Sequence, residues 1–484
     1  MNISCGCAAL SLVLGLSSAQ ADPPQFAPCQ LTAPGTPFRT TARCSKLAVA
    51  ENPSAPQNRV INLRIAVIPA RSRQAQPDPI VLLAGGPGQA ATEAYPPLAA
   101  AFYDLNRSHD ILLVDQRGTG GSNALHCPEI DGAPTTPPSP TQQQRLTQAC
   151  LQALPGDPRY YTTSQAVADL DQVRTALGYN QLNLLGISYG TRVALAYLRR
   201  YPDQVRSLVL DGIVPSELAL GAEHALNAQQ ALELIIKQCR SEPACARRFP
   251  DPNDDFKVLH QTLAAESVEV NLADPQTSTQ RTANFNDATL AGVVRLLSYA
   301  PETVALLPLL LDHARRSGDY SRLAAQSLLV TAHLDEQISH GMELSVICTE
   351  DVPFYTADAI ATSRDTYLGA RLIEAAKTQC AVWPRGKLPV DFKTPVLADT
   401  PALLLSGEWD PVTPPRYGER LHKRLRNSLH LVAPGQGHNV FPRGCLPRVV
   451  ADFVAMASIK GLDHECIKEL GPAAFFTSFT GPEP

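Results

Sequence analysis

A serine between two glycines has the setting that most clearly indicates chemistry. Gly186-Ile187-Ser188-Tyr189-Gly190 follows an apolar run at 182–185 and precedes a helical pattern that begins at Thr191. Glycine on both sides permits a turn too tight for side chains, and such a turn holds the Ser188 hydroxyl at a strand–helix junction. The following helix directs free N–H groups and its positive dipole end toward a developing oxyanion. The pattern is typical of a nucleophilic serine.

A nucleophilic serine needs a base, and the base needs an acid that orients it. Asp410 lies in a glycine-containing turn after the apolar run 402–405, and His438 follows the next apolar run, 429–432. A triad is expected in the chain order Ser, Asp, His when the serine lies in a turn of this kind. We predict Ser188 as the nucleophile, His438 as the base and Asp410 as the acid, with Glu408 as the alternative acid.

Hydrolysis through a serine also requires two backbone donors that bind the oxyanion. The N–H of Tyr189, directly after the nucleophile, is the first candidate. The second is Gly86, or its neighbour Gly85, in the glycine-rich loop 84–88 that follows the apolar run 80–83. Glycines allow the backbone to approach a substrate closely. A plain Gly-Pro turn is the alternative interpretation of this loop.

These residues follow short apolar runs that are too short for helices and are bounded by turn residues. The runs predict buried strands at 80–83, 111–114, 182–185, 208–210, 402–405 and 429–432. Helical patterns alternate with them, which predicts a mostly parallel sheet with helices on both faces. The alternating run 59–69 predicts an antiparallel strand at the sheet edge, and 22–58 is expected to be irregular and held by a disulfide.

The alternation stops between about 215 and 393, where long amphipathic helical patterns follow one another. We expect helices at 225–239, 287–298, 303–316, 322–334 and 357–376. This region is predicted to be a mainly helical cap inserted between two strands of the sheet. The predicted organisation is a signal peptide at 1–21, the first part of the core at 22–214, the cap at 215–393 and the second part of the core at 394–484.

Composition indicates a globular protein and gives no sign of nucleic acid as a partner. The 484 residues are 44% hydrophobic and 18% charged, with a formal net charge of −5. Residues 1–21 combine a short apolar run with the cleavage pattern Ala19-Gln20-Ala21, which predicts a secretory signal. No later apolar stretch has transmembrane length, so we expect no membrane association after signal cleavage.

Cysteine usage agrees with export to a secreted or periplasmic location. Of 12 cysteines, Cys5 and Cys7 lie in the predicted signal. The remainder fall as neighbours and predict five local disulfides, although sequence alone leaves the connectivity open: Cys29 with Cys44, Cys127 with Cys150, Cys239 with Cys245, Cys348 with Cys380, and Cys445 with Cys466. No zinc-ligand spacing is present, so neither a metal nor another cofactor is expected.

Several of these stretches resemble a known family. Residues 84–88 look like the H-G-G-P-G loop of proline iminopeptidases, 115–122 match their D-Q-R-G-x-G-x-S segment, and Ser188 lies in their G-x-S-Y-G motif. The cysteines, the 209–212 segment and the tail beyond Gly437 are similar to secreted tripeptidyl aminopeptidase-like proteins. The resemblance covers about 40–212 and 395–466, and in the cap only 345–350. Ala84 stands where the family usually has His. The loop rigidity and the substrate preference of the family therefore do not carry over to this chain.

The resemblance implies an α/β-hydrolase fold and a serine aminopeptidase that acts on peptides with a free N-terminus. In that family, acids of the cap bind the α-ammonium group. Glu350 is the candidate for this role, with Asp351 behind it, whereas an ordinary solvated acid at a helix end is the alternative. A carboxylesterase and a non-catalytic binding module are the other functions considered. The sequence does not indicate the oligomeric state and is compatible with a monomer.

Overall fold

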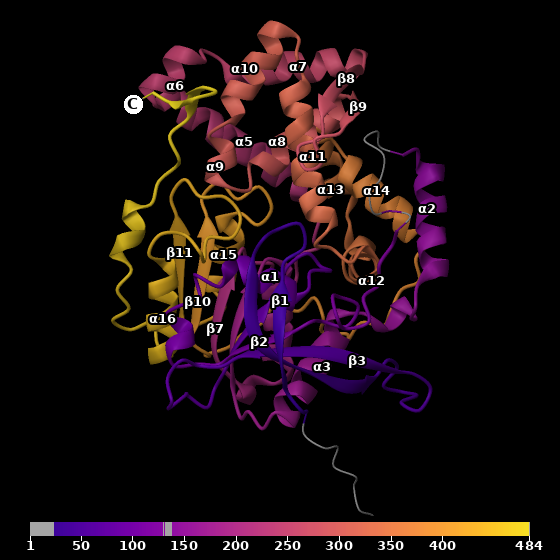
Figure 1. The fold of residues 1–484 in the computed structure, drawn as a ribbon, viewed down its shortest axis with the longest axis vertical. Helices are drawn as coiled ribbons and strands as arrows, with labels where there is room; N and C mark the ends of the chain where they lie inside the picture. Colours follow the sequence, from indigo (N-terminus) through magenta and orange to yellow (C-terminus); the bar gives the residue numbers. More distant parts are fainter. Residues whose placement is uncertain (1–23, 129, 131–137, 484) are drawn as a thin grey trace, which may run out of the picture.

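The computed structural model describes residues 24–128, 130 and 138–483, so the expected signal peptide lies outside the described residues. Its centre is a nine-stranded sheet with six parallel strands and three antiparallel ones at one side (Figure 1). In spatial order the strands are β1 (Ala27–Thr32), β2 (Arg39–Ala50), β3 (Val60–Ile68), β5 (Ile111–Val114), β4 (Ile80–Leu83), β6 (Leu182–Ile187), β7 (Val205–Asp211), β10 (Ala402–Gly407) and β11 (Ser428–Ala433).

Helices cover both faces of this sheet, which explains why its central strands are apolar without interruption. In β4 every residue is buried, and because side chains alternate, Val81 and Leu83 face one layer while Ile80 and Leu82 face the other. The first layer contains α3 (Thr163–Ala176), α4 (Tyr189–Arg200) and the end of α15 (Pro415–His422). The second contains α1 (Ala91–Leu98) and α16 (Leu446–Met456). The predicted fold class is therefore confirmed.

The N-terminal segment differs from the expectation. Instead of an irregular lead-in, 24–58 contains β1 and β2, and the strand expected at the edge, β3, is third from it. Half of the β1 and β2 side chains are exposed, and only single positions such as Leu31, Ala42 and Val49 are buried. A polar edge ribbon has too few apolar residues to show a strong alternation, so it resembles a loop in sequence.

Between β7 and β10 the chain forms the expected cap, which occupies the upper part of Figure 1. Its elements are α5 (His224–Ser241), α6 (Pro243–Arg248), α7 (Pro252–Ala265), β8 (Val268–Ala273), β9 (Gln280–Phe285), α8 (Asp287–Leu297), α9 (Pro301–Val304), α10 (Leu307–Ser317), α11 (Ser321–Asp335), α12 (His340–Glu350), α13 (Ala357–Arg364) and α14 (Arg371–Cys380).

The cap divides into two packed parts. Helices α5 to α11 and the β8–β9 hairpin share one apolar cluster. In contrast, α12 and α14 pack against α2 (Pro140–Ala153) of the core around two disulfides. Met342 and Val346 of α12 also pack into the apolar layer that contains α3 and α4. The second part of the cap is thus joined to the core.

Several cap details differ from the expected helices. The pattern at 303–316 is divided between α9 and α10, with a proline in the first turn of α10. The pattern at 357–376 is interrupted near Gly369, which has a φ of +60°. The β8–β9 hairpin and the helices α6, α7 and α12 were not expected. The half-exposed hairpin and the six-residue α6 carry weaker periodicity than the long helices do.

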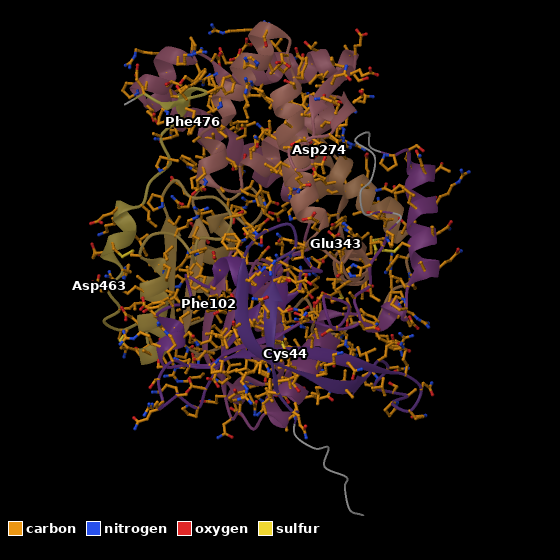
Figure 2. The ribbon with its side chains drawn as sticks, in the orientation of Figure 1. Cys44, Phe102, Asp274, Glu343, Asp463 and Phe476 are labelled. Atoms are coloured by element: carbon orange, nitrogen blue, oxygen red, sulfur yellow. A yellow bond between two sulfur atoms is a disulfide. The ribbon has the colours of Figure 1, made fainter. Side chains whose placement is uncertain are left out.

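The C-terminal segment also departs from the expected division, because it leaves the core and packs on the cap. Its hairpin consists of β12 (Phe476–Ser478) and β13 (Gly481–Pro482). The N–H of Phe476 donates to the carbonyl of Ala305 at 2.9 Å, and Arg247 pairs with Glu483. Figure 2 shows Phe476 beside the cap helices, far from Asp463 of the core.

Five disulfides join the neighbouring cysteines: Cys29–Cys44, Cys127–Cys150, Cys239–Cys245, Cys348–Cys380 and Cys445–Cys466. The disulfide at Cys44, labelled in Figure 2, links β1 to its neighbour β2 at one edge of the sheet. Short 3-10 helices lie at Leu105–Arg107, Pro158–Tyr160, Pro202–Gln204, Val352–Phe354 and Glu465–Glu469. None of the helices in the described ranges is both long and apolar enough to cross a membrane.

Candidate active site

The turn between β6 and α4 holds Ser188 in a backbone conformation that few non-glycine residues adopt. Its φ is +55° and its ψ is −122°, a strained geometry of the kind found at active sites. A Cβ at Gly186 would lie 2.6 Å from the Gly190 carbonyl oxygen, and one at Gly190 would lie 2.0 Å from that of Leu83. Both glycines are therefore required for the turn to pack against β4.

Asp410 and His438 form a buried pair at the carboxyl ends of β10 and β11. His438 Nδ1 lies 2.7 Å from Asp410 Oδ2, and the two side chains are 5% and 0% exposed. Thr413 donates its hydroxyl to the same Asp410 oxygen at 2.8 Å and lies 3.2 Å from His438 Nδ1. Burial opposes ionisation of both groups, but their pairing holds the pKa of Asp410 below, and that of His438 above, its ordinary value. The pair is suited to a base that becomes an imidazolium.

The end of β7 connects the serine turn to the histidine loop. The Ser188 N–H donates to the Asp211 carbonyl at 2.8 Å, and the Asp211 carboxylate accepts from the N–H groups of Val440 and Phe441 at 3.0 and 2.8 Å. A Cβ at Gly212 would lie 3.0 Å from His438 Cε1. Burial raises the pKa of Asp211 to about 6. Sequence reasoning gave Asp211 no role, although an acid at the end of the strand next to β6 was a usable signal.

The glycine loop after β4 lies against the serine turn. A Cβ at Gly85 would be 3.3 Å from that of Ser188. The Gly85 N–H donates to the Gln89 side chain at 3.3 Å, whereas no hydrogen bond among the described residues occupies the N–H of Gly86 or of Tyr189. These two groups are the free donors beside the nucleophile, which favours Gly86 over Gly85 for the oxyanion hole.

Glu350 and Asp351 lie in a different place from the one expected for an ammonium-binding site. Both are 0% exposed. Glu350 accepts from the Thr163 N–H and hydroxyl, both at 2.7 Å, and Asp351 makes a bidentate pair with Arg192 at 2.9 Å. Neither carboxylate has an exposed surface for a substrate. The expected assignment is therefore corrected, because these acids at the end of α12 join the cap to α3 and α4.

Other cap residues do lie next to the triad. The ring of Tyr299 packs edge-on against the His438 ring, with 5.4 Å between the centroids. The backbone N–H of His438 donates to the Tyr299 carbonyl at 2.8 Å. Arg295, one turn earlier, donates to the Tyr299 hydroxyl at 2.8 Å. Sequence reasoning missed both residues, since nothing in the α8 pattern distinguishes them from an ordinary helix end.

No group of three or more His, Cys, Asp and Glu residues in the described ranges is arranged to hold a metal ion. The components of the candidate site come from five strand ends, those of β4, β6, β7, β10 and β11, and from one face of the cap.

Two family models match the chain. The model for the alpha/beta hydrolase fold matches residues 78–236, which contain Gly85, Gly86 and Ser188. The model for TAP-like proteins matches residues 365–466, which contain Asp410 and His438. Together the two matches include the candidate catalytic residues and the strands that carry them.

Curated relatives point to the same group. The chain is 26% identical to the serine protease Hip1 of Mycobacterium tuberculosis over 474 residues, covering 89% of this chain and 88% of the relative. It is 24% identical to a tripeptidyl aminopeptidase of Streptomyces lividans, covering 68% and 64%. It is 31% identical to a proline iminopeptidase of Neisseria gonorrhoeae, covering 29% and 35%.

A solved proline iminopeptidase from Mycobacterium smegmatis matches with a TM-score of 0.37 and 18% identity, over 85% of this chain and 98% of that one, a likeness too distant to bear on function. The first family model, described as the alpha/beta hydrolase fold, agrees with the mostly parallel sheet of the structure. The chain has the α/β-hydrolase fold and is a serine hydrolase that is similar to the tripeptidyl and prolyl aminopeptidase-like peptidases.

Proposed function

We propose that this protein is an exported serine exopeptidase that cleaves peptides near a free N-terminus through an acyl-enzyme at Ser188. The observation that carries the proposal is the buried pair of His438 and Asp410, 2.7 Å apart, at the sheet edge that also holds Ser188 at its positive φ. Peptidase relatives support a peptide substrate, and the names of two of them support action at the N-terminus.

In the proposed reaction, His438 removes the proton of the Ser188 hydroxyl as the oxygen attacks the peptide carbonyl. The N–H groups of Tyr189 and Gly86 bind the resulting oxyanion. His438 then gives its proton to the departing amine, which leaves an acyl ester on Ser188. A water molecule, deprotonated by His438, hydrolyses this ester and restores the hydroxyl. Asp410 orients the imidazole and stabilises its charged form.

Export is supported by the five disulfides of the structure, since such bonds persist in oxidising compartments. The sequence pattern of 1–21 supports the same proposal. We therefore place the working protein in the periplasm or outside the cell.

A carboxylesterase is the second candidate, and one observation favours it. An aminopeptidase needs a group that binds the substrate ammonium, and the two acids first considered for this role are buried and paired. An esterase with the same triad and oxyanion hole has no such need.

The deciding experiment compares a tripeptide nitroanilide, its N-acetylated form and a short-chain nitrophenyl ester. We expect the free peptide to be cleaved at least about tenfold faster than the acetylated one, because a buried ammonium site loses its charged partner on acetylation. Equal rates on both peptides would contradict exopeptidase action. Efficient hydrolysis of the ester alone would promote the esterase.

Ser188→Ala provides the test of the nucleophile. Its turnover should fall by about a thousandfold or more on every substrate while its thermal unfolding stays unchanged. Ser317→Ala, at the exposed end of α10, is the matched control and should keep wild-type rates. A Ser188→Ala protein that retains a tenth of its turnover would refute the proposed mechanism.

A further inference from the structure

We propose that three cap residues, His224, Arg295 and Tyr367, form a binding site for a carboxylate carried by the substrate. We refer to them as the cap donor cluster. The inference rests on the proposed function, because it assigns a second group of the same substrate to the cap. It names the chemistry that the cap recognises, which the triad and oxyanion hole do not determine.

The first argument is that each member has a buried polar atom without a hydrogen-bond partner in the described structure: His224 Nε2, Arg295 Nε and the Tyr367 hydroxyl. An unpartnered buried polar group costs about 1–3 kcal/mol, and such groups are few in native proteins. Three of them near one site indicate that a ligand completes their hydrogen bonds.

The second argument is position. His224 begins α5, Arg295 lies in the last turn of α8, and Tyr367 follows α13, so three separate segments supply the cluster. The Tyr367 N–H donates to Gln229 of α5 at 3.2 Å, which fixes this loop against the helix that His224 begins. Arg295 also contacts Tyr299, whose ring packs on His438. The cluster therefore lies on the cap side of the triad.

Electrostatic effects agree with this proximity. Burial acts to lower the pKa of His438 and of His224. The positive charge of Arg295 lowers both pKa values as well, so Arg295 must lie near both histidines. Burial with this positive neighbour lowers the pKa of His224 to about 3, so its ring is neutral. Burial raises the pKa of Tyr367, so its hydroxyl keeps its proton as a donor.

The third argument is the charge that remains to be balanced. Among the described residues, no carboxylate forms an ion pair with Arg295. The acids whose charges reach His224 are Asp351 and Asp410, and each is already paired, with Arg192 and His438 respectively. A guanidinium, a phenol hydroxyl and a neutral imidazole together offer donors, which suit an anionic oxygen group and repel an ammonium.

A substrate carboxylate can come from two sources. One is the free C-terminus of a short peptide, and the other is an Asp or Glu side chain near the scissile bond. Both present the same pair of oxygens to Arg295. The experiment separates them through the peptides chosen.

The test uses the full mature protein and four tetrapeptides with free N-termini, with products measured by mass spectrometry. Ala-Ala-Ala-Ala is compared with its C-terminal carboxamide, and Ala-Ala-Asp-Ala amide with Ala-Ala-Asn-Ala amide. We expect one acid to exceed its neutral partner in kcat/KM by about tenfold to a hundredfold, as charge-assisted hydrogen bonds allow. The pair that shows the preference identifies the source of the carboxylate.

Two variants connect this preference to the cluster. Arg295→Met should bring the ratio of acid to neutral substrate close to one. Tyr367→Phe removes only the unpartnered hydroxyl, so its melting temperature should be equal to or above that of the wild type while the ratio falls. Arg371→Gln, which removes an exposed arginine that pairs with Asp287 at the start of α8, is the control and should keep the wild-type ratio.

Equal rates on acid and neutral peptides by the wild type would overturn the inference, and so would an unchanged ratio in both cluster variants. A preference for the neutral peptides would do the same. These outcomes are distinct from failure of the proposed function, in which Ser188→Ala would remain active or none of the tetrapeptides would be cleaved by the wild type.

Discussion

The molecule contains two regions of buried charge, which are built from similar residues for different purposes. At the carboxyl edge of the sheet, Asp410 is paired with His438, which can gain and lose a proton. At the seam between cap and core, Asp351 is paired with Arg192, which cannot. Both acids are almost completely buried. The partner, rather than burial or charge, decides which region can perform acid–base chemistry.

The seam also contacts the nucleophile turn. Thr163 donates its hydroxyl to Glu350 at 2.7 Å and lies 2.6 Å from the hydroxyl of Tyr189, the residue directly after Ser188. In Figure 2, Glu343, on the same helix as Glu350, lies where the cap meets the core. The end of α12 thus supports the turn from behind, and its acids contribute to packing rather than to substrate binding.

The largest expected effect is a loss of kcat when the pair of Asp410 and His438 is disrupted. Asp410→Asn should lower kcat by about 10⁴-fold, because the imidazole loses the acid that sets its tautomer. Its thermal unfolding should change far less than its rate. Glu408→Gln is the control, since Glu408 bonds the Gly435 N–H instead of the histidine. Greater damage from Glu408→Gln would mean that the wrong acid has been assigned.

The second prediction concerns the contact between cap and core that is made by Arg192 and Asp351. Arg192→Met should reduce the free energy of unfolding by about 3–5 kcal/mol, because it leaves the buried Asp351 carboxylate without its main partner. Chemical denaturation measures this loss. Arg200→Met, at the exposed end of the same helix, should cost little. If the two variants are equally stable, the seam does not hold the cap to the core.

The smallest effect concerns Glu350, and it depends on pH. Burial, partly offset by Arg192, raises the pKa of Glu350 to about 7. At pH values between the ordinary pKa of a glutamate and about 7, Glu350 is ionised in the unfolded chain but protonated in the folded chain. The contribution of Glu350 to the free energy of unfolding therefore falls as pH rises. Glu350→Gln should cost about 1–3 kcal/mol near pH 5, and less near pH 7. Melting temperatures at both pH values measure this change.

Glu350→Gln should also reduce peptide and ester hydrolysis by the same factor, because the residue acts on folding rather than on one substrate. A selective loss on free peptides would restore Glu350 as the ammonium site. A stability gap that widens toward pH 7 would mean that the ionised carboxylate stabilises the fold.

Much of the sheet, and the position of the candidate triad at its edge, could be predicted from local pattern. The four-residue runs of β4 and β5 are fully buried, and their apolar sequences show this directly. Ser188, Asp410 and His438 each follow such a run, and the carboxyl ends of parallel strands meet at one edge. Local sequence therefore implied their convergence without any knowledge of the loops.

The acids of the cap could not be placed in this way. A helix end that carries Glu350 and Asp351 has the same local sequence whether it faces solvent, a substrate or Arg192. Their partners, Thr163 and Arg192, lie 187 and 159 residues away in the chain. The edge strands β1 and β2 were missed for a related reason, because polar ribbons are stabilised by pairing across the sheet rather than by their own pattern.

Sequence alone therefore determined the presence of the buried central strands, the glycines of the serine turn and the order of the candidate triad, since short-range sterics and burial decide them. Tertiary structure decided which charges are neutralised inside the protein. Asp351 was assigned to packing by the arrival of Arg192 from α4. Arg295 forms no ion pair with a carboxylate among the described residues and instead donates to Tyr299, which packs on His438. Charge compensation acts through space at a few ångströms, and chain separation carries no information about it.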